Sequence, residues 1–204
     1  PLSNLDASLR TEMRQELLNL HRELNATFLF VTHDQIEALT LADLLIVMDN
    51  GIIQQIGTPQ EIYAFPQNEF VAKFIGSSAI NLIEDVTLNK LSDSRFSCSL
   101  LGKEVTFDIE DKNNENAEYI VDIGIRPEDF EISTTNKTEY IIKSCEFFGD
   151  TYLYVCESIE KNDMLLRVKS NKVYKINESV SLKFKPYKLH LFEKISKKRI
   201  KLMR

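Results

Sequence analysis

The sequence changes character near residues 77–78. From there on, short runs rich in β-branched, aromatic and aliphatic residues alternate with polar clusters that favour turns, such as 110–116 and 134–138. Many short strands separated by turns are typical of a small β barrel or sandwich. Strands are expected over residues 81–88, 95–101, 104–109, 119–125, 140–147, 152–157, 164–168, 179–184 and 189–192.

The first part of the chain has a helical pattern instead. Apolar residues recur at spacings of three and four from Leu9 to Leu24, which places them on one face of a helix. Asp6 stands where an N-cap would lie, and Asn25 is expected to end the helix.

A strand–helix–strand unit is expected next. Residues 27–31 form a continuously apolar run with β-branched and aromatic members, as in strands that are buried on both faces of a parallel sheet. Residues 34–42 predict a helix, and residues 44–48 predict a second buried strand. This order indicates an α/β crossover unit.

Turn and capping signals fill the stretch before the β-rich part. Asn50-Gly51 is a strong hairpin signal. Residues 58–61, Thr-Pro-Gln-Glu, combine a capping box with a proline at the first helical position, so they open a helix. A further short helix is expected over 68–75, and the domain boundary near 76–80.

The charge of the chain is uneven. Its formal net charge is −6, yet residues 194–204 carry six basic side chains and no acid, so the preceding residues carry −12. An acidic body is a poor binder of nucleic acid, because phosphate neutralisation needs a basic face. The basic tail is expected to be a solvated, frayed terminus, with contact to RNA or anionic lipid as the alternative.

Composition and residue spacing argue against several kinds of protein and site. Cys98, Cys145 and Cys156 show no C-x-x-C spacing and lie among apolar or β-prone neighbours, so buried, reduced thiols are expected rather than a disulfide or a zinc site. No apolar run reaches the roughly 18 residues that a membrane helix needs.

No signal peptide precedes Leu2, so the chain is expected in the cytoplasm. Six glycines are few for this length and argue against a complete glycine-rich phosphate loop.

His33 is the most informative single residue. It follows the apolar run 27–31 and precedes the next predicted helix. Ligands of open α/β sheets bind at the carboxyl ends of strands, and a helix N-terminus favours an anion such as phosphate. From position alone, a histidine that caps the helix or packs there stays the alternative. His21 and His190 are too isolated to be assigned a role.

Two further stretches have structural interpretations when taken alone. Residues 1–6 are a polar loop that leads into a helix. Residues 124–129, Gly-Ile-Arg-Pro-Glu-Asp, end a strand and turn, and Arg126 is expected to pair with a neighbouring carboxylate. The sequence contains no Ser/His/Asp set, no cysteine nucleophile near a histidine and no histidine spacing typical of a metal site.

Together, these stretches resemble the ATPases of ABC transporters. Residues 1–7, PLSNLDA, look like the end of the Walker B segment running into the D-loop, and residues 30–38, FVTHDQIEA, match the H-loop with its switch histidine. Residues 124–129, GIRPED, resemble the hallmark of the C-terminal TOBE domain. The importers of this superfamily also have, in the same order along the chain, segments similar to residues 50–51, 55–59 and 70–76.

The resemblance implies two domains of different class. Residues 1–77 would be the C-terminal part of an α/β, P-loop or RecA-like nucleotide-binding domain, and residues 78–204 an all-β, OB-like TOBE domain with a regulatory role. The family's Walker A loop, Q-loop, signature motif and Walker B carboxylates are expected upstream in a longer parent protein, with the catalytic glutamate immediately before Pro1. The chain alone is therefore expected to be inactive as an ATPase.

The resemblance transfers few site residues. His33 would contact the ATP γ-phosphate and hold the attacking water in register with the catalytic glutamate. Ser3, Asn4 and Asp6 would form the D-loop, which crosses the interface of an ATPase homodimer. ATP and Mg²⁺ would be cofactors of the parent, and no metal ligand is expected in this chain. The other partners implied are transmembrane permease subunits and, indirectly, a solute-binding protein, which would place the chain on the cytoplasmic face of the cell membrane.

Two short stretches indicate the transported solute. Residues 74–81 are similar to the linker of maltose and glycerol-phosphate importers, and residues 147–151 fall where these importers have a comparable glycine turn, which favours a sugar or glycerol phosphate. Polyamine, iron and sulfate or molybdate importers share the TOBE arrangement and stay as alternatives. A different class of function, a stand-alone ligand-sensing or protein-interaction module, also stays open, although a sensor has no use for a γ-phosphate contact.

Overall fold

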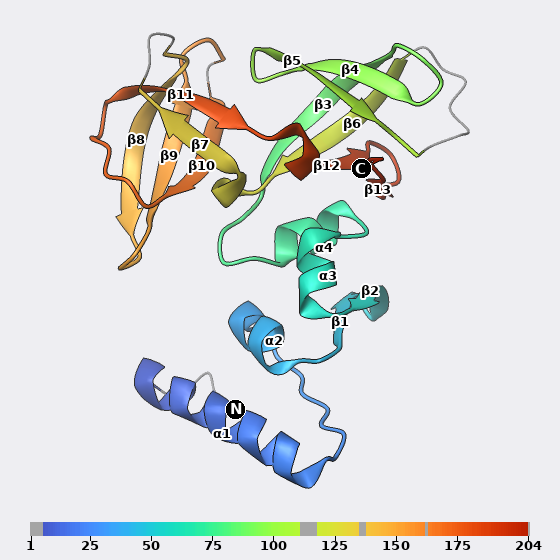
Figure 1. The fold of residues 1–204 in the computed structure, drawn as a ribbon, viewed down its shortest axis with the longest axis vertical. Helices are drawn as coiled ribbons and strands as arrows, with labels where there is room; N and C mark the ends of the chain where they lie inside the picture. The colour runs from blue at the N-terminus through green and yellow to red at the C-terminus, as the bar shows by residue number, and fades with distance from the viewer. Residues whose placement is uncertain (1–5, 111–117, 135–137, 162, 204) are drawn as a thin grey trace.

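The computed structural model describes residues 6–110, 118–134, 138–161 and 163–203, which form a helical region followed by a β region (Figure 1). The β region has most of the regular structure, in agreement with the all-β domain predicted for the second part of the chain. The elements of the helical region are α1 (Ala7–Leu24), α2 (Gln35–Leu41), β1 (Leu45–Asp49), β2 (Ile52–Gly57), α3 (Pro59–Ala64) and α4 (Glu69–Phe74).

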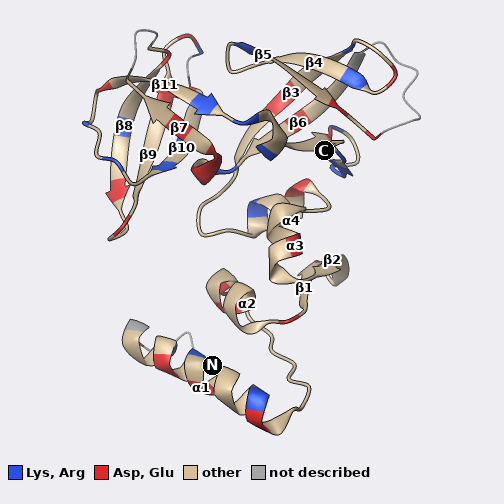
Figure 2. Ribbon diagram, in the orientation of Figure 1, with Lys and Arg blue, Asp and Glu red and all other residues tan. Residues whose placement is uncertain are grey.

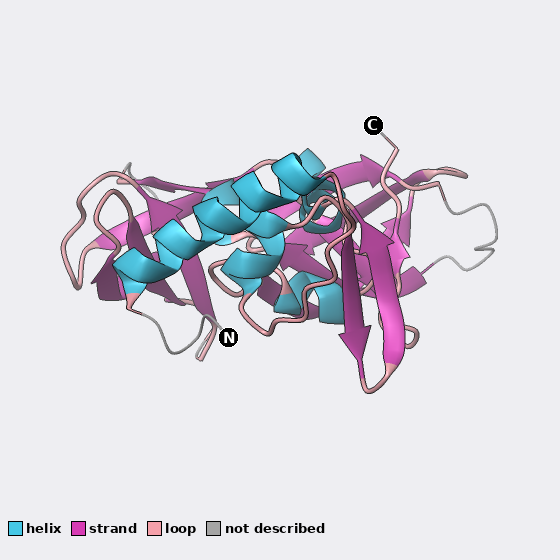
Figure 3. Cartoon of the chain, turned by 90° about the horizontal axis from the view of Figure 1, so that it is seen from below, coloured by secondary structure: helices cyan, strands magenta, loops and turns pink. Residues whose placement is uncertain are grey.

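Helix α1 forms as its sequence predicts. The Asp6 carboxylate accepts a hydrogen bond from the backbone N–H of Leu9 at 2.8 Å and caps the first turn. Asn25 ends the helix in the left-handed conformation, with a φ of 45°. Figure 1 shows α1 at the end of the molecule opposite the β region, and in Figure 3, which is seen from that end, α1 lies in front.

The strand predicted over residues 27–31 does not form, so the expected α/β crossover is wrong for this chain. These residues lie in an irregular connection between α1 and α2, where Leu29 is 89% and Val31 84% exposed. A strand needs a neighbour to pair its backbone groups. Among the described residues, the other predicted strand, β1, pairs with β2 instead. Residues 27–31 therefore have the pattern of a buried strand, but no described segment pairs with them or buries their apolar side chains.

The hairpin and the two short helices form as predicted. Strands β1 and β2 pair antiparallel through a turn in which Asn50 and Gly51 both have positive φ. Thr58 and Glu61 make the capping box of α3. A small buried cluster joins the hairpin to α3 and α4, and its members are Val47, Ile62, Val71 and Ile75.

The β region consists of two antiparallel sheets. The six-stranded sheet has the order β13-β12-β6-β3-β4-β5, and the five-stranded sheet has the order β10-β9-β8-β11-β7. All the predicted strands are present, whereas β7 and β13 were not expected. The strands are β3 (Asn81–Lys90), β4 (Arg95–Leu100), β5 (Lys103–Asp108), β6 (Glu118–Ile125), β7 (Phe130–Ser133), β8 (Tyr140–Phe147), β9 (Tyr152–Ser158), β10 (Leu165–Ser170), β11 (Ser179–Phe184), β12 (His190–Glu193) and β13 (Arg199–Ile200).

The two sheets lie side by side and share one hydrophobic core (Figure 1). Buried residues from both, such as Val121 of β6 and Val180 of β11, belong to the same cluster. Asn81 of β3 ties the sheets together, because its side-chain amide donates to the Arg167 carbonyl at 2.8 Å and accepts from the Arg167 backbone N–H at 2.6 Å. This all-β architecture is consistent with the OB-like fold expected for the region.

The basic tail is not frayed, which corrects the prediction. The backbone N–H of Arg199 donates to the Gln67 carbonyl at 2.9 Å, and the N–H of Glu69 donates to the Lys197 carbonyl at 3.0 Å. Figure 2 shows the basic residues near the C-terminus beside the acidic start of α4. The prediction failed because it considered the charges of the tail alone, whereas their acidic partners stand on other elements.

The described residues contain no helix that combines the length and the apolar content needed to cross a membrane. All three cysteines are free thiols. Cys98 and Cys156 are buried, as predicted, whereas the prediction of a buried thiol is wrong for Cys145, which is only partly buried. Burial raises the pKa of Cys98 to about 11 and that of Cys156 to about 12, so both thiols stay protonated at neutral pH.

Candidate functional site

His33 lies on the turn that leads into α2, and its side chain is exposed. The neighbouring Asp34 is the N-cap of α2, since its carboxylate accepts hydrogen bonds from the backbone N–H groups of Ile36 at 2.8 Å and Glu37 at 3.1 Å. The imidazole therefore neither caps the helix nor packs in a core. Both structural alternatives for His33 are excluded by this geometry.

Hydrogen bonds fix the backbone on both sides of His33. The Thr32 hydroxyl accepts from the backbone N–H of Asp34 at 2.9 Å and donates to the Glu37 carboxylate at 2.7 Å. Glu37 is buried, so this bond is shielded from water. The turn is held in one conformation while the imidazole stays accessible.

Two arginines of α1 face the carboxylates of this turn. Arg14 lies 3.5 Å from the Asp34 carboxylate and 3.6 Å from that of Glu37, and Arg10 lies 3.9 Å from Asp34. Partly buried ion pairs are screened by salt less than exposed ones. These pairs attach α1 to the turn that carries His33.

Helix α2 is also attached to Gly76 and to the small buried cluster of the helical region. The side-chain oxygen of Gln35 accepts a hydrogen bond from the backbone N–H of Gly76 at 3.1 Å. Leu39 packs against the buried cluster that contains Ile75. A helix of seven residues is too short to be stable alone, so these tertiary contacts set the position of α2.

Arg126 approaches the same residues from the β region. It is 2% exposed, and its guanidinium donates to the carbonyls of Ala72 at 3.1 Å, Ile75 at 2.5 Å and Tyr63 at 3.4 Å. These acceptors stand at the C-terminal ends of α4 and α3, where helices leave carbonyls unpaired and the helix dipole favours a cation. The guanidinium also lies 4.2 Å from the centre of the Tyr63 ring.

The expected ion pair of Arg126 is therefore wrong. Among the described residues, no carboxylate lies within ion-pair distance of the guanidinium, which is held by carbonyl oxygens. Burial lowers the pKa of Arg126 to about 10, against the opposite effect of the nearby Asp129, so the side chain is still charged at neutral pH.

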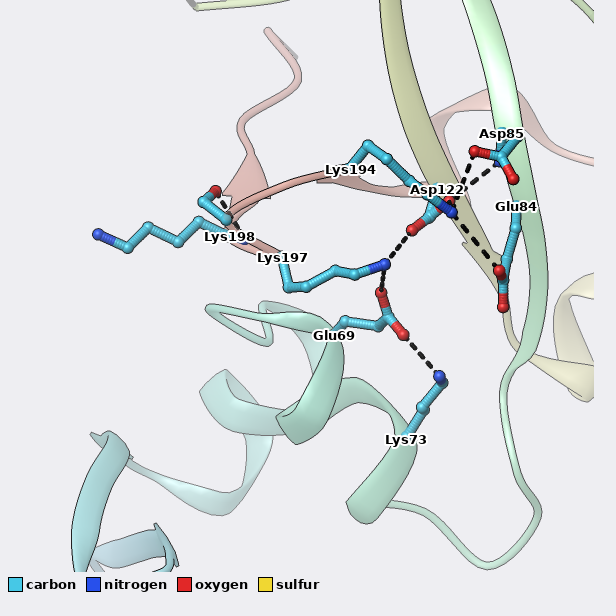
Figure 4. A network of polar contacts seen from close by, with 9 residues as sticks. Glu69, Lys73, Glu84, Asp85, Asp122, Lys194, Lys197 and Lys198 are labelled. Carbon is cyan, nitrogen blue, oxygen red and sulfur yellow. Dashed lines mark hydrogen bonds and ion pairs between the residues drawn. The ribbon is translucent and has the colours of Figure 1, made fainter.

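A second polar network joins α4 to the six-stranded sheet (Figure 4). The buried carboxylate of Asp122, on β6, contacts Lys197 at 2.6 Å and Lys194 at 3.2 Å. Lys197 also contacts Glu69 of α4 at 3.0 Å. Burial by itself raises the pKa of Asp122, but hydrogen bonds from Lys197, the Asp85 backbone and Lys194 outweigh it, and the pKa falls below its usual value.

The predicted D-loop is only partly described. Asp6 caps α1, whereas Ser3 and Asn4 lie outside the described residues. Within the described part of the chain, no hydrogen bond or ion pair joins Asp6 to His33. Of the predicted site residues that the structure describes, Asp6 and His33 are therefore not joined directly, and the D-loop assignment stays a prediction.

The described residues do not build a nucleotide site by themselves. Two hollows of about 270 Å³ and 70 Å³ lie in the β region, and His33 lines neither. No cluster of three or more His, Cys, Asp or Glu side chains in the described ranges could hold a metal ion. One exposed imidazole fits one contact to a phosphate, but these residues do not fit a complete site for ATP with Mg²⁺.

Sequence reasoning missed Gln35 and the bridge between Asp122 and Lys197. Gln35 stands inside the stretch that resembles the H-loop, two residues after His33, but its partner Gly76 is 41 positions away. The acidic residue in the otherwise apolar strand 119–125 was the available signal for Asp122, because a buried carboxylate requires a partner.

Comparisons with known proteins agree with the motifs around His33 and Arg126. Residues 123–192 match the TOBE domain family. The chain is 40% identical over 196 residues to the spermidine/putrescine import ATP-binding protein PotA of Mesoplasma florum, which covers 95% of this chain and 53% of that protein. Identity to the protein of the same name in Borrelia garinii subsp. bavariensis is 43%, with the same coverage.

A maltose/maltodextrin import ATP-binding protein, MalK of Aliivibrio fischeri, is 36% identical over 197 residues, which covers 94% of this chain and 53% of the relative. The chain thus spans about half the length of the curated relatives that it matches.

Proposed function

Because the chain belongs to the family of ABC importer ATP-binding proteins, we propose that it is part of the subunit that couples ATP hydrolysis to solute uptake. The observation that carries this proposal is the exposed His33 on a fixed turn, within the stretch that resembles the H-loop. The similarity runs over 196 residues, so it includes this turn as well as the TOBE region. That extent favours a transport ATPase over a stand-alone sensing module.

His33 would act by position rather than by covalent chemistry. Phosphoryl transfer depends mainly on orientation and on stabilising charge, and a hydrogen bond from the imidazole to the γ-phosphate would help to orient the attacking water. The bonds of Thr32 and Asp34 support this role because they limit the motion of the turn. The remaining contacts to ATP and Mg²⁺, including the catalytic glutamate, would come from the rest of the longer subunit.

The domain organisation and the partners belong to the same proposal. Residues 1–77 would complete a nucleotide-binding domain, and residues 78–204 would form the accessory domain. The exposed Leu29 and Val31 support this division, because they have the pattern of a buried strand. Ser3, Asn4 and Asp6 would face a second ATPase subunit, and the assembly would include permease subunits and a solute-binding protein at the cytoplasmic face of the membrane.

The test uses the full-length subunit assembled with its permease. His33→Ala is expected to leave ATP binding nearly intact and to lower turnover about 100-fold or more, the usual scale for one lost positioning contact. His21→Ala, in α1, is the matched control and should keep normal turnover. Near-normal turnover of His33→Ala would remove the switch role.

The solute that we propose is a polyamine. The two relatives named for spermidine and putrescine import are 40% and 43% identical to the chain, and the relative named for maltose import is 36% identical. The higher sequence identity to the polyamine importers favours a polyamine over the sugar or glycerol phosphate that the linker 74–81 indicated. Uptake of labelled spermidine into vesicles that contain the whole transporter, compared with maltose, is the measurement, and uptake of maltose alone would overturn the assignment.

A further inference from the structure

One peptide group connects Gln35 to Arg126. The carbonyl of Ile75 accepts a hydrogen bond from Arg126 at 2.5 Å, and the N–H of Gly76 donates to Gln35 at 3.1 Å. The carbonyl and the N–H are the two ends of the same peptide unit, between residues 75 and 76. The β region and the first residue of α2 therefore hold opposite sides of a single planar group.

The planarity of this group couples its two hydrogen bonds. The C=O and the N–H of a trans peptide point in opposite directions and turn together, so a rotation that breaks one bond misaligns the other. The positive charge of Arg126 also polarises the peptide and strengthens the bond that the N–H donates. Loss of the Arg126 contact is therefore transmitted to Gln35.

Gly76 permits this arrangement. It has a φ of +137°, which side-chain-bearing residues rarely adopt, and a Cβ at this position would lie 2.8 Å from the Arg126 guanidinium. Glycine thus allows both the backbone turn and the close approach of Arg126. The buried arginine, the glycine and the glutamine form one continuous structural link, although they come from three different parts of the chain.

We propose that Arg126 and Gln35 are positioning residues for His33. Arg126 fixes the peptide between residues 75 and 76, this peptide fixes Gln35, and Gln35 fixes the end of α2 that carries the His33 turn. The inference rests on the proposed function, because it assigns to these residues the orientation of the switch histidine. It gives the β region an influence on hydrolysis without any contact with the nucleotide.

The first test is steady-state ATP hydrolysis by the full-length subunit assembled with its permease. Gln35→Leu removes the acceptor at similar size and is expected to lower kcat about tenfold or more, as misplacement of a catalytic group does, while KM for ATP stays nearly constant. Gln35→Glu keeps an acceptor oxygen and should restore most of kcat. Gln60→Leu, on the exposed side of α3, is the matched control and should be neutral. Normal kcat in Gln35→Leu would overturn the proposal.

The second test asks whether the effect passes through His33. In a His33→Ala background, Gln35→Leu and Arg126→Lys should cause no further loss of kcat, because residues that act through one group are not additive. A second, full loss in that background would mean that Gln35 and Arg126 act on general stability, which would overturn the proposal.

A structural measurement separates this inference from the proposed function. Gln35→Leu and Arg126→Lys should each speed hydrogen exchange at the amides of α2 but not at those of α1. Unchanged exchange in α2 of Gln35→Leu, which is the milder variant, would overturn the positioning role. If His33→Ala alone kept normal turnover, the proposed function would fail, while the exchange result would still decide whether Arg126 positions the turn.

Discussion

The ammonium group of Lys197 lies 2.6 Å from the carboxylate of Asp122, whose side chain has no exposed surface. The same lysine contacts Glu69 at the start of α4 at 3.0 Å. Its backbone carbonyl accepts a hydrogen bond from the Glu69 N–H, also at 3.0 Å. One residue of the basic tail thus bridges the sheet and the helical region.

Lys197→Met is therefore expected to lower the melting temperature more than Lys198→Met. Lys198 is the matched control, because it is the next residue, is exposed and points away from Asp122 (Figure 4). Both changes remove one positive charge from the same segment, so the difference between them reports the bridge. Thermal unfolding at low ionic strength, where ion pairs are screened least, measures it. Equal melting temperatures would show that the bridge contributes nothing.

Asp122 predicts a loss of stability in acid. Its pKa is lowered in the folded chain, so the ionised carboxylate stabilises the fold at pH values above the usual aspartate pKa of about 4. This stabilisation is lost as the pH falls below that value and through the lower pKa of the folded state.

Asp122→Asn removes this titration. At pH 7 it is expected to cost about 2 kcal/mol, less than a fully buried ion pair would, because both lysines keep contact with water. Urea unfolding of the two proteins between pH 3 and pH 7 should show the difference shrinking below about pH 4. A difference that stays constant over this range would contradict the role of the ionised carboxylate.

Gly76→Ala should destabilise the chain more than Gly51→Ala. Both glycines have positive φ, but a Cβ at Gly51 meets open space, whereas one at Gly76 meets Arg126 at 2.8 Å. Backbone strain alone costs about 1 kcal/mol, and displacement of a buried, hydrogen-bonded arginine adds about 1 to 3 kcal/mol. Chemical denaturation of both variants tests the order, and equal costs would mean that Arg126 moves aside freely.

The local features of the fold could be predicted from the sequence because their causes are local. Asp6 caps α1, Asn25 ends it and Asn50-Gly51 turns the hairpin through interactions within a few residues. The strand predicted over 27–31 failed for the opposite reason, since a strand forms only where another strand pairs with it.

In the candidate site, too, local features could be predicted, whereas contacts between residues far apart in the sequence could not. His33 could be found from its motif, because the residues of that motif are neighbours in the chain. The Gln35–Gly76 contact spans 41 positions and the Asp122–Lys197 contact spans 75, so no short pattern encodes either of them. Arg126 was recognised as structural, but its acceptors are carbonyls, and backbone carbonyls leave no mark on the sequence.

The chain taken alone is expected to self-associate through its helical region. Leu29 is 89% exposed and Val31 84%, and the β1–β2 hairpin of the same region also exposes Met48 and Ile52. Exposed apolar segments and unpaired backbone groups favour pairing with a second copy. The strand pattern of 27–31 makes intermolecular strand pairing the expected mode.

Leu29→Ser is expected to reduce this self-association, and Leu91→Ser is its matched control. Leu91 is a similarly apolar residue in the β region and is 57% exposed, but it lies in the turn between β3 and β4 rather than in an unpaired strand-like segment. Sedimentation velocity over a range of concentrations compares the two variants with the unmodified chain. If Leu91→Ser lowered the association as much as Leu29→Ser, the contact would depend on general surface hydrophobicity. If Leu29→Ser left the distribution of sedimentation coefficients unchanged, the self-association would be assigned to the β region instead.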